Sequence, residues 1–197
     1  DEVRTLIQEG VQRYGKMNRP QERLKALAQK VTVVIPDGGT VALSEGPVKA
    51  VRRYESPIRE NEVVAGRYRL EQLIGEGSSG KVFKAQDQLL HITVALKILA
   101  SRLTSDESAI ATLKAEARIA MELSHRNIVR LHNFEQAGDV YFLVMEFVEG
   151  CTLRDVLTQD GSLPLDSVTF IMRACSSALS YAHGYGAVHK DLKPENL

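Results

Sequence analysis

The chain has little cysteine and no excess of charge of either sign. Its two cysteines, Cys151 and Cys175, are too few for a disulfide framework or a cysteine-based zinc site, so a reducing compartment is expected. The 25 basic and 25 acidic residues cancel, which argues against nucleic acid or an anionic membrane as the main partner. The sequence also lacks a signal peptide and an apolar run of the roughly 18 residues that a membrane span requires. These absences predict a cytoplasmic protein.

Apolar side chains make up 44% of the 197 residues, enough for a sizeable buried core. In the first region, residues 1–45, apolar spacing predicts helices over 3–16 and 21–30, followed by a short hairpin. Residues 46–66 carry prolines, many charges and no clear period, which is typical of a linker. We recognise no catalytic motif in residues 1–60, so the role of this part stays open.

A different pattern begins near residue 67. Alternation of apolar and polar residues predicts antiparallel strands at 68–77, 81–87, 91–99, 128–136 and 140–148. A helix is expected over 105–124, between the third and fourth strands, with Ser105 or Asp106 as its N-cap. The order of elements predicts an α+β fold, with a five-stranded antiparallel sheet followed by a helical part.

Two helices are expected after the last strand. The first is short, over 150–159, and the second covers 166–184, with Asp166 as its N-cap. The longer helix carries a stripe of apolar residues at helical spacing, which predicts its buried face. The stripe consists of Ile171, Cys175, Ala178 and Ala182.

The stretch "GEGSSG" contains three glycines in a G-x-G-x-x-G pattern, at Gly75, Gly77 and Gly80. In the dinucleotide-binding version, this pattern follows a strand and opens a helix. Here the expected strands 68–77 and 81–87 lie on its two sides. A hairpin without side chains can lay its backbone N–H groups over a polyphosphate, but the same residues also suit an ordinary tight turn. The loop alone leaves both interpretations open.

Lys97 lies in the apolar strand segment "VALKIL". A lysine there either reaches out to solvent or needs an anionic partner, because an unpaired buried charge is costly. Glu116 shares a helix face with Leu113 and Ala120, which predicts a Lys97–Glu116 ion pair with charged atoms within about 4 Å. The alternative is that Glu116 is a solvated helix residue.

The last chemistry-bearing stretch is "HKDLKPEN", residues 189–196. Asp191 and Asn196 are separated by five positions and are expected to converge as an acceptor and a metal ligand. Lys193 lies between them in sequence and could meet a phosphate. His189 is expected to pack and orient the loop.

These motifs together resemble the first half of a eukaryotic-type protein kinase domain of the serine/threonine kind, a family with bacterial members. The resemblance covers residues 68–197 and depends on "GEGSSGKV", "VALK", Glu116 in "KAEARIAMELSHRNIVRL", "VMEFVEG" and "HKDLKPEN" in this order, a highly specific combination. It implies a two-lobed protein-kinase-like fold, with ATP and Mg²⁺ bound in the cleft. We therefore expect a kinase domain over residues 67–197.

The resemblance implies a role for each matched residue. Asp191 matches the base that accepts the proton of the substrate hydroxyl, Lys193 the residue that contacts the γ-phosphate, and Asn196 a magnesium ligand. Lys97 matches the lysine that holds the α- and β-phosphates, with Glu116 as its partner. The loop "DLKPEN" indicates Ser or Thr of a protein substrate as the acceptor. The matched nucleotide-binding positions are Gly75, Glu76, Gly77 and Gly80 in the flap, Val82, Ala95 and Met145 around the adenine, Lys97 and Glu116 near the phosphates, and the backbone of Glu146 and Val148 at the adenine edge.

The sequence departs from the family pattern at two positions. Lys190 stands where arginine is usual and lacks the planar fork of arginine, which puts regulation by activation-loop phosphorylation in doubt. Thr152 stands where many relatives have an acidic contact to the ribose, so a shorter, neutral contact is expected.

The chain begins at Asp1 and stops at Leu197 within "KPENL", and we expect it to be part of a longer protein. The second magnesium-binding aspartate of the family would lie beyond Leu197, so this piece alone is expected to be inactive.

Two other functions stay open at this stage. One is a pseudokinase, a nucleotide-binding scaffold that regulates a partner, although Lys97, Glu116, Asp191 and Asn196 are all retained. The other is a signalling protein in which residues 1–60 recognise the partner and the kinase part acts as a relay.

Overall fold

The computed structural model describes residues 58–104 and 106–197 of the chain. The expected N-terminal helices and hairpin, most of the expected linker and the candidate cap Ser105 lie outside the described residues. The described chain divides into two compact units. Residues 58–122 and 130–147 form a sheet unit, and residues 123–129 and 148–197 form a helical unit.

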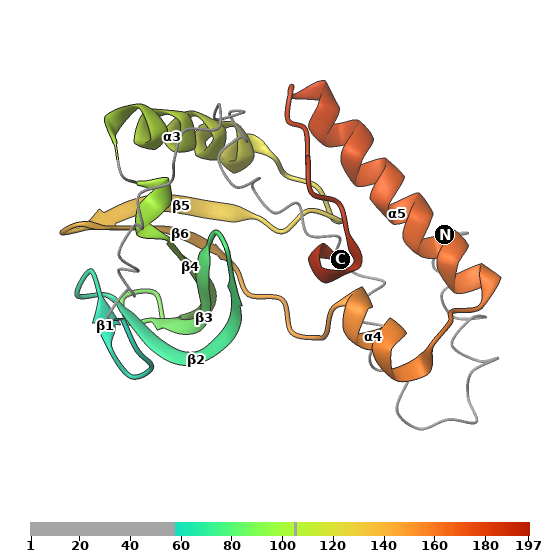
Figure 1. Cartoon of the computed structure of the whole chain (residues 1–197), viewed down its shortest axis with the longest axis horizontal. Helices are drawn as coiled ribbons and strands as arrows, with labels where there is room; N and C mark the ends of the chain where they lie inside the picture. The colour runs from blue at the N-terminus through green and yellow to red at the C-terminus, as the bar shows by residue number, and fades with distance from the viewer. Residues whose placement is uncertain (1–57, 105) are drawn as a thin grey trace, which may run out of the picture. The chain divides into compact units, whose positions relative to one another are not determined.

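The described residues of the sheet unit form six strands, one α-helix (α3) and one 3-10 turn (η1), and the turn and the helix lie between β4 and β5. The sheet is antiparallel, in the order β1-β2-β3-β4-β6-β5, and α3 lies beside β5 (Figure 1). The elements are β1 Val63–Val64, β2 Tyr68–Gly77, β3 Gly80–Asp87, β4 Ile92–Leu99, the 3-10 turn η1 Ser101–Leu103, α3 Glu107–Glu122, β5 Leu131–Ala137 and β6 Val140–Glu146. The protein-kinase-like α+β expectation is confirmed, although the sheet has one strand more than the five predicted.

The additional strand is β1, which pairs with the start of β2 through Val63 opposite Arg69 and Val64 opposite Tyr68. Further bonds extend the contact, because Asn61 N donates to Leu70 O and Leu70 N donates to Glu62 O, both at 2.9 Å. Two residues are too few to show a period of two in the sequence. Pairing with β2 and burial of Val64 create this strand, so local pattern alone could not predict it.

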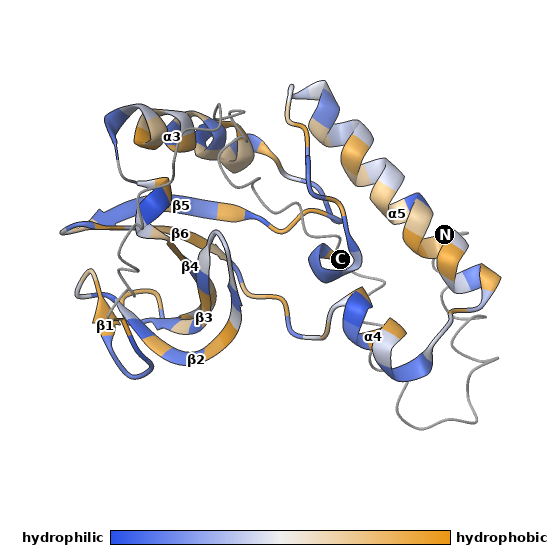
Figure 2. Cartoon of the chain, in the orientation of Figure 1, coloured by the Kyte–Doolittle hydropathy of each residue, from blue (hydrophilic) through white to orange (hydrophobic). Residues whose placement is uncertain are grey.

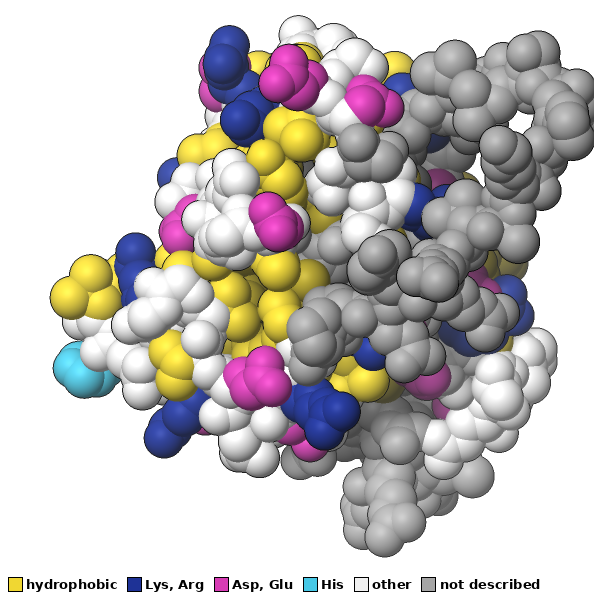
Figure 3. All heavy atoms as spheres, turned by 60° about the vertical axis from the view of Figure 1, so that its left-hand side comes forward, with side chains coloured by type: hydrophobic (Ala, Val, Ile, Leu, Met, Phe, Trp, Pro, Cys, Tyr) yellow, Lys and Arg dark blue, Asp and Glu magenta, His cyan; other side chains and the backbone are white. Residues whose placement is uncertain are grey.

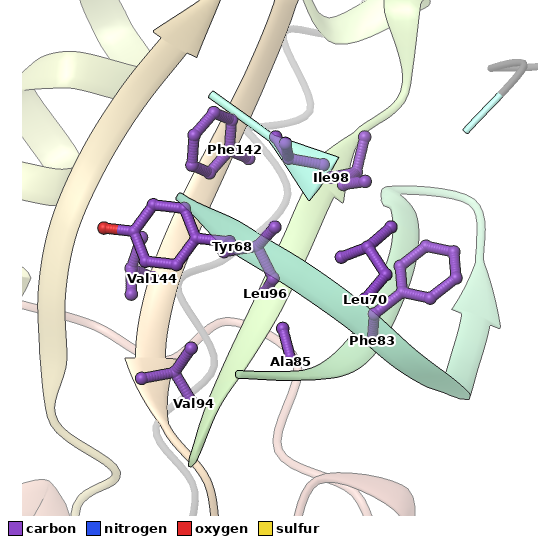
Figure 4. Packing of buried hydrophobic residues seen from close by; sticks show 10 residues of the cluster. Tyr68, Leu70, Phe83, Ala85, Val94, Leu96, Ile98, Phe142 and Val144 are labelled. Carbon is purple, nitrogen blue, oxygen red and sulfur yellow. The ribbon is translucent and has the colours of Figure 1, made fainter. Parts of the chain in front are cut away.

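Alternation along the strands separates two apolar layers in the sheet unit. On one face, side chains of β2, β3, β4 and β6 pack together in the cluster shown in Figure 4. On the other face, α3 covers the sheet and packs against residues of β4, β5 and β6. The first cluster contains Val64, Tyr68, Leu70, Phe83, Ala85, Val94, Leu96, Ile98, Phe142 and Val144, and the second contains Leu99, Leu113, Ala117, Leu131 and Leu143.

Helix α3 begins with an acidic N-cap. Asp106 Oδ1 accepts hydrogen bonds from Ala109 N at 2.8 Å and Ser108 Oγ at 2.7 Å. These bonds satisfy a backbone donor that the helix cannot pair internally, and they lower the pKa of the Asp106 carboxyl. Of the two expected caps, the described one, Asp106, is confirmed.

The helical unit packs α4 (Leu153–Asp160) and α5 (Leu165–Gly184) around one core, with a 3-10 turn η2 at Pro194–Asn196. Apolar and polar residues are interleaved along α5 (Figure 2), and the predicted stripe is confirmed. The core consists of Leu123, Ile128, Leu153, Val156, Ile171, Cys175, Ala178 and Ala182. Burial raises the pKa of the Cys175 thiol, which agrees with a structural role.

The start of α5 corrects one prediction. The helix begins at Leu165, its N-cap is Pro164, and no side chain caps it. Asp166 therefore lies in the first turn of the helix, where its negative charge interacts favourably with the positive end of the helix dipole. Proline supplies a suitable φ of −59° just before the helix, and the N-cap therefore lies two residues upstream of the expected Asp166.

Charged side chains of both signs are interspersed with apolar ones on the face shown in Figure 3. Several apolar side chains of the sheet unit are exposed, including Leu89 in the turn between β3 and β4. Leu90 and Ile92, close to it in the chain, are exposed as well, and some apolar exposure is normal on protein surfaces.

The turn between β3 and β4 is fixed by Asp87, which is only 1% exposed. Its carboxylate accepts two bonds from the Arg67 guanidinium, at 2.7 and 3.0 Å. It also accepts backbone bonds from Leu89 N at 2.9 Å and Leu90 N at 3.1 Å. The arginine pair is the largest of these effects, and together they lower the pKa of Asp87 from 3.8 to about 2.

We expect Asp87→Asn to destabilise the protein and to reduce the acid sensitivity of its stability. The pKa of Asp87 is lower in the folded state, so folding favours its charged form. This contribution is fully present above about pH 5 and is lost as the pH falls through the folded pKa of about 2. A shift of this size corresponds to about 2 kcal/mol. Urea denaturation at a series of pH values between 7 and about 2 measures this loss.

The matched control is Asp139→Asn, which changes an exposed aspartate in the turn between β5 and β6. It should leave both the free energy of unfolding and its pH dependence close to those of the unmodified protein. If Asp87→Asn and Asp139→Asn behave alike, the Arg67–Asp87 contact does not support the fold as described.

Candidate functional site

The glycine-rich stretch forms the hairpin between β2 and β3. Gly75 pairs with Val82, and Gly77 pairs with Gly80 at the tip. The strand–loop–strand arrangement predicted from the sequence is therefore confirmed. Arg102 Nε, from η1, donates to Ser78 O at 3.0 Å.

The surroundings that an added side chain would meet differ among the three glycines of the hairpin. Gly80 has a φ of +142°, and an added Cβ would lie 1.9 Å from the carbonyl oxygen of Ile98. The fold itself therefore requires glycine at position 80. An added Cβ on Gly77 would meet nothing within 4 Å, and one on Gly75 would lie at an ordinary 3.8 Å from Val82 Cβ. The fold does not require glycine at positions 75 and 77 in the way that it requires Gly80.

Several predicted nucleotide-binding side chains lie on one face of the sheet. Val82 on β3 pairs with Lys97 on β4, and Ala95 on β4 pairs with Met145 on β6. Residues that pair across strands share a face, and so do residues two apart on one strand. This face is opposite to the one on which Leu96 belongs to the first core cluster. The fold thus brings these four predicted residues together.

Lys97 is buried, with 6% of its surface exposed, on the face of the sheet that α3 covers. Glu116 lies on α3 three residues after the buried Leu113 and directly before the buried Ala117. The Oε2 atom of Glu116 is itself buried. Lys97 and Glu116 therefore belong to the same side of the sheet, as the ion-pair hypothesis requires, and their direct contact stays a prediction.

The next predicted nucleotide-binding residues lie at the end of strand β6. Met145 is half-buried beside the cluster of α3, and β6 ends at Glu146. Glu146 N donates to the carbonyl oxygen of Arg130 at 2.9 Å. Glu76 in the flap forms an ion pair with Lys81, with 3.6 Å between Oε1 and Nζ. Val148 belongs to the helical unit, and 36% of its surface is exposed.

In the helical unit, the side chains of Asp191, Lys193 and Asn196 converge as predicted. Lys193 Nζ lies 2.7 Å from Asp191 Oδ2. Asn196 Nδ2 donates to the carbonyl oxygen of Asp191 at 2.7 Å and to its Oδ2 at 3.1 Å. The bond from Lys193 is the main cause that lowers the pKa of the Asp191 carboxyl. The cluster therefore holds an ionised carboxylate, an ammonium group and an amide within one short loop.

The loop that carries Asp191 contains an unusual backbone conformation. Asp191 N donates to His189 O at 2.7 Å, across Lys190, which has a φ of +57°. A positive φ is uncommon for lysine, and such three-residue turns are rare and strained. His189 is 4% exposed, and its Nδ1 accepts from Asp191 N at 3.3 Å. The packing of His189 is confirmed, and its role in orienting the loop stays a prediction.

Two interactions near this loop were not predicted from the sequence. Arg154 on α4 pairs with Glu195, at 2.8 Å between Nε and Oε1. Thr152 is the N-cap of α4, and it forms a capping box with Asp155, in which Asp155 Oδ2 accepts from Thr152 N at 2.9 Å. The spacing T-x-x-D is a recognisable capping signal, whereas nothing in the sequence connects Arg154 to Glu195.

Comparison with known proteins decides the family. The family model for the protein kinase domain matches residues 68–197. The chain belongs to the protein kinase family.

Its kinase relatives include bacterial proteins named as serine/threonine-protein kinases. The chain is 43% identical over 137 residues to pkn3 of Myxococcus xanthus, covering 69% of this chain and 25% of that kinase. It is 37% identical over 134 residues to PrkC of Bacillus subtilis, covering 68% of this chain and 21% of that kinase. The kinase chain described here thus spans a quarter or less of these relatives.

A solved kinase structure supports the fold. The kinase domain of PknI from Mycobacterium tuberculosis aligns with a TM-score of 0.63 and 26% sequence identity, covering 71% of this chain and 56% of that domain. The protein-kinase-like fold is therefore shown for this part of the domain. Within the described residues, none of the helices combines the length and apolar character needed to cross a bilayer.

Proposed function

We propose that this chain is the first part of the catalytic domain of a protein serine/threonine kinase. The complete domain would transfer the γ-phosphate of ATP, with Mg²⁺, to Ser or Thr of a protein substrate. The observation that carries the proposal is the convergence of Asp191, Lys193 and Asn196 in a chain of the protein kinase family. Because ATP is the phosphoryl donor, we propose that this domain works in the cytoplasm.

The sheet unit would bind the nucleotide. The flap at Gly75 and Gly77 has room for phosphates against its backbone, because an added Cβ at Gly77 would meet nothing within 4 Å and the fold does not use this space. Lys97 would hold the α- and β-phosphates, and Glu116 would orient its ammonium group through an ion pair. The remaining proposed nucleotide contacts are Glu76 and Gly80 in the flap, Val82, Ala95 and Met145 around the adenine, and the backbone of Glu146 and Val148.

The helical unit would carry the residues that act on the acceptor. The carboxylate of Asp191 would accept the hydrogen bond, and finally the proton, of the substrate hydroxyl. The bond from Lys193 lowers the pKa of Asp191, so its carboxylate is ionised and can accept this hydrogen bond. Lys193 would neutralise charge on the transferred phosphoryl group.

Asn196 would contribute its amide oxygen to magnesium. When bound, Mg²⁺ would neutralise charge on the β- and γ-phosphates. Among the described residues, no three His, Cys, Asp or Glu side chains cluster so that they could hold a metal ion. Magnesium commonly takes only one or two protein ligands and completes its shell with phosphates and water.

The test is a phosphotransfer assay on the complete kinase domain, with Lys97→Met as the decisive variant. Removing the buried cation should weaken ATP binding and lower transfer to a Ser/Thr protein substrate by at least about 100-fold, because charge stabilisation is the main catalytic contribution here. Transfer of radiolabelled phosphate and ATP affinity by calorimetry measure the two effects.

The matched control is Lys114→Met, on the exposed face of α3, which should leave both quantities unchanged. We also expect residues 1–197 alone to be inactive, since the family's second magnesium-binding aspartate would lie beyond Leu197. A complete domain that binds ATP but transfers no phosphate would indicate the pseudokinase alternative instead. A partner-recognition role of residues 1–60 concerns a segment that lies almost entirely outside the described residues.

A further inference from the structure

Two hydrogen bonds connect the loop that carries Asn196 to the first turn of α4. Arg154 Nε donates to Glu195 Oε1 at 2.8 Å, and Leu153 N donates to Leu197 O at 2.8 Å. The two accepting residues flank Asn196 in the sequence. The position of Asn196 is therefore set from both sides by consecutive residues of a separate helix.

The start of α4 is a firm support for these bonds. Leu153 and Val156 are buried in the core of the helical unit, with 8% and 2% of their surfaces exposed. The capping box between Thr152 and Asp155 closes the first turn of α4. Burial and capping together fix the backbone from which Arg154 extends.

The Arg154–Glu195 pair itself contributes little to global stability. Its side chains are 52% and 44% exposed, and exposed ion pairs are weakened by solvent and salt. Its larger effect is local, because η2 is a single turn of three residues with few internal bonds to hold its orientation. The planar guanidinium of Arg154 restricts the direction of Glu195 more than a lysine ammonium would.

We propose that Arg154 is a positioning residue for phosphoryl transfer: by holding Glu195, it fixes the amide of Asn196 relative to Asp191. This inference rests on the proposed function, in which Asn196 binds magnesium. Asn196 already donates to Asp191 Oδ2 at 3.1 Å, so a rotation of η2 would move the metal ligand and the proton acceptor apart. Contacts that orient metal ligands typically contribute about 10- to 100-fold to metal affinity or activity.

The experiment uses the complete kinase domain with Arg154→Ala. We expect kcat to fall by about 10-fold and the magnesium concentration for half-maximal transfer to rise by about 10-fold, with little change in the KM for the protein substrate. In the nucleotide-free protein, amide hydrogen exchange in residues 191–197 should become faster. The melting temperature should stay within about 3 °C, as expected for an exposed ion pair.

Three further variants separate positioning from general damage. Arg173→Ala removes an exposed arginine of α5 and should change none of these quantities. Arg154→Lys keeps the charge and should recover part of kcat. Exchange of the two charges, Arg154→Glu with Glu195→Arg, should recover more activity than either single change, even if Arg154→Ala folds poorly.

The outcomes distinguish this inference from the proposed function. If the unmodified domain transfers phosphate and Arg154→Ala leaves the magnesium dependence and the loop exchange unchanged, the inference is wrong and the proposed function stands. Failure of the charge exchange to restore activity also overturns it. If the unmodified domain transfers no phosphate, the proposed function and this inference fall together.

Discussion

Replacing Asp191 with asparagine in the complete kinase domain is expected to lower kcat by about 100- to 10,000-fold, the usual cost of losing a general base. Asparagine keeps an oxygen that can accept a hydrogen bond but cannot take the proton of the substrate hydroxyl. It also removes the charge that pairs with Lys193 at 2.7 Å. ATP affinity should change little, because Asp191 is proposed to act on the substrate hydroxyl, whereas the flap and Lys97 are proposed to hold the nucleotide. Steady-state kinetics together with nucleotide titration measure the two effects.

Asp160→Asn provides a control for general loss of an aspartate in the helical unit. Asp160 is an exposed residue at the end of α4, and its replacement should leave kcat and ATP affinity unchanged. Near-normal turnover in Asp191→Asn would show that another group accepts the proton. Equal losses of ATP affinity and kcat would show that Asp191 acts on the nucleotide.

Gly80→Ala is expected to destabilise the domain by about 3 kcal/mol or more. The added Cβ would lie 1.9 Å from the carbonyl oxygen of Ile98, and the φ of +142° is unfavourable for alanine. A backbone atom cannot move aside by rotating a side chain, so the pairing between β3 and β4 must distort. Strain and overpacking of this kind belong to the most damaging single changes. Urea denaturation measures the loss.

Gly77→Ala is the matched change at the other glycine of the hairpin tip. Its Cβ would meet nothing within 4 Å, so the free energy of unfolding should stay within about 0.5 kcal/mol. ATP affinity should nevertheless fall, because the methyl group would occupy space proposed for the phosphates. Equal destabilisation by the two substitutions would contradict the structural distinction, and unchanged ATP affinity in Gly77→Ala would contradict the proposed flap.

The sequence predicted the elements whose pattern is long and regular. The alternation in 68–99 and the apolar stripe from Ile171 to Ala182 are each repeated often enough to identify a strand or a helix face. The strand Val63–Val64 was missed because it exists only through pairing with β2. The cap of α5 was assigned to Asp166 because polar side chains are the usual signal, whereas Pro164 starts this helix without a side-chain bond.

For the candidate site, spacing within one loop predicted the convergence of Asp191, Lys193 and Asn196. Contacts between distant segments were not predictable in the same way. Arg154 and Glu195 are 41 positions apart, and nothing in a single sequence indicates that their side chains are in contact. The different roles of Gly77 and Gly80 depend on the position of Ile98 across the sheet, which only the folded backbone reveals.

The segment before the family boundary covers part of the edge of β2. β2 is the last long strand on its side of the sheet, and an uncovered strand of this kind is a template for pairing with another chain. Here Glu62 O and Asn61 N satisfy both backbone groups of Leu70 at 2.9 Å, and Glu60 Oε1 accepts from Leu73 N at 2.7 Å. A chain shortened to begin at Tyr68, where the family match starts, would lose all three bonds. Residues outside the catalytic motifs therefore satisfy backbone groups of β2 that a shorter chain would leave open to pairing with another strand.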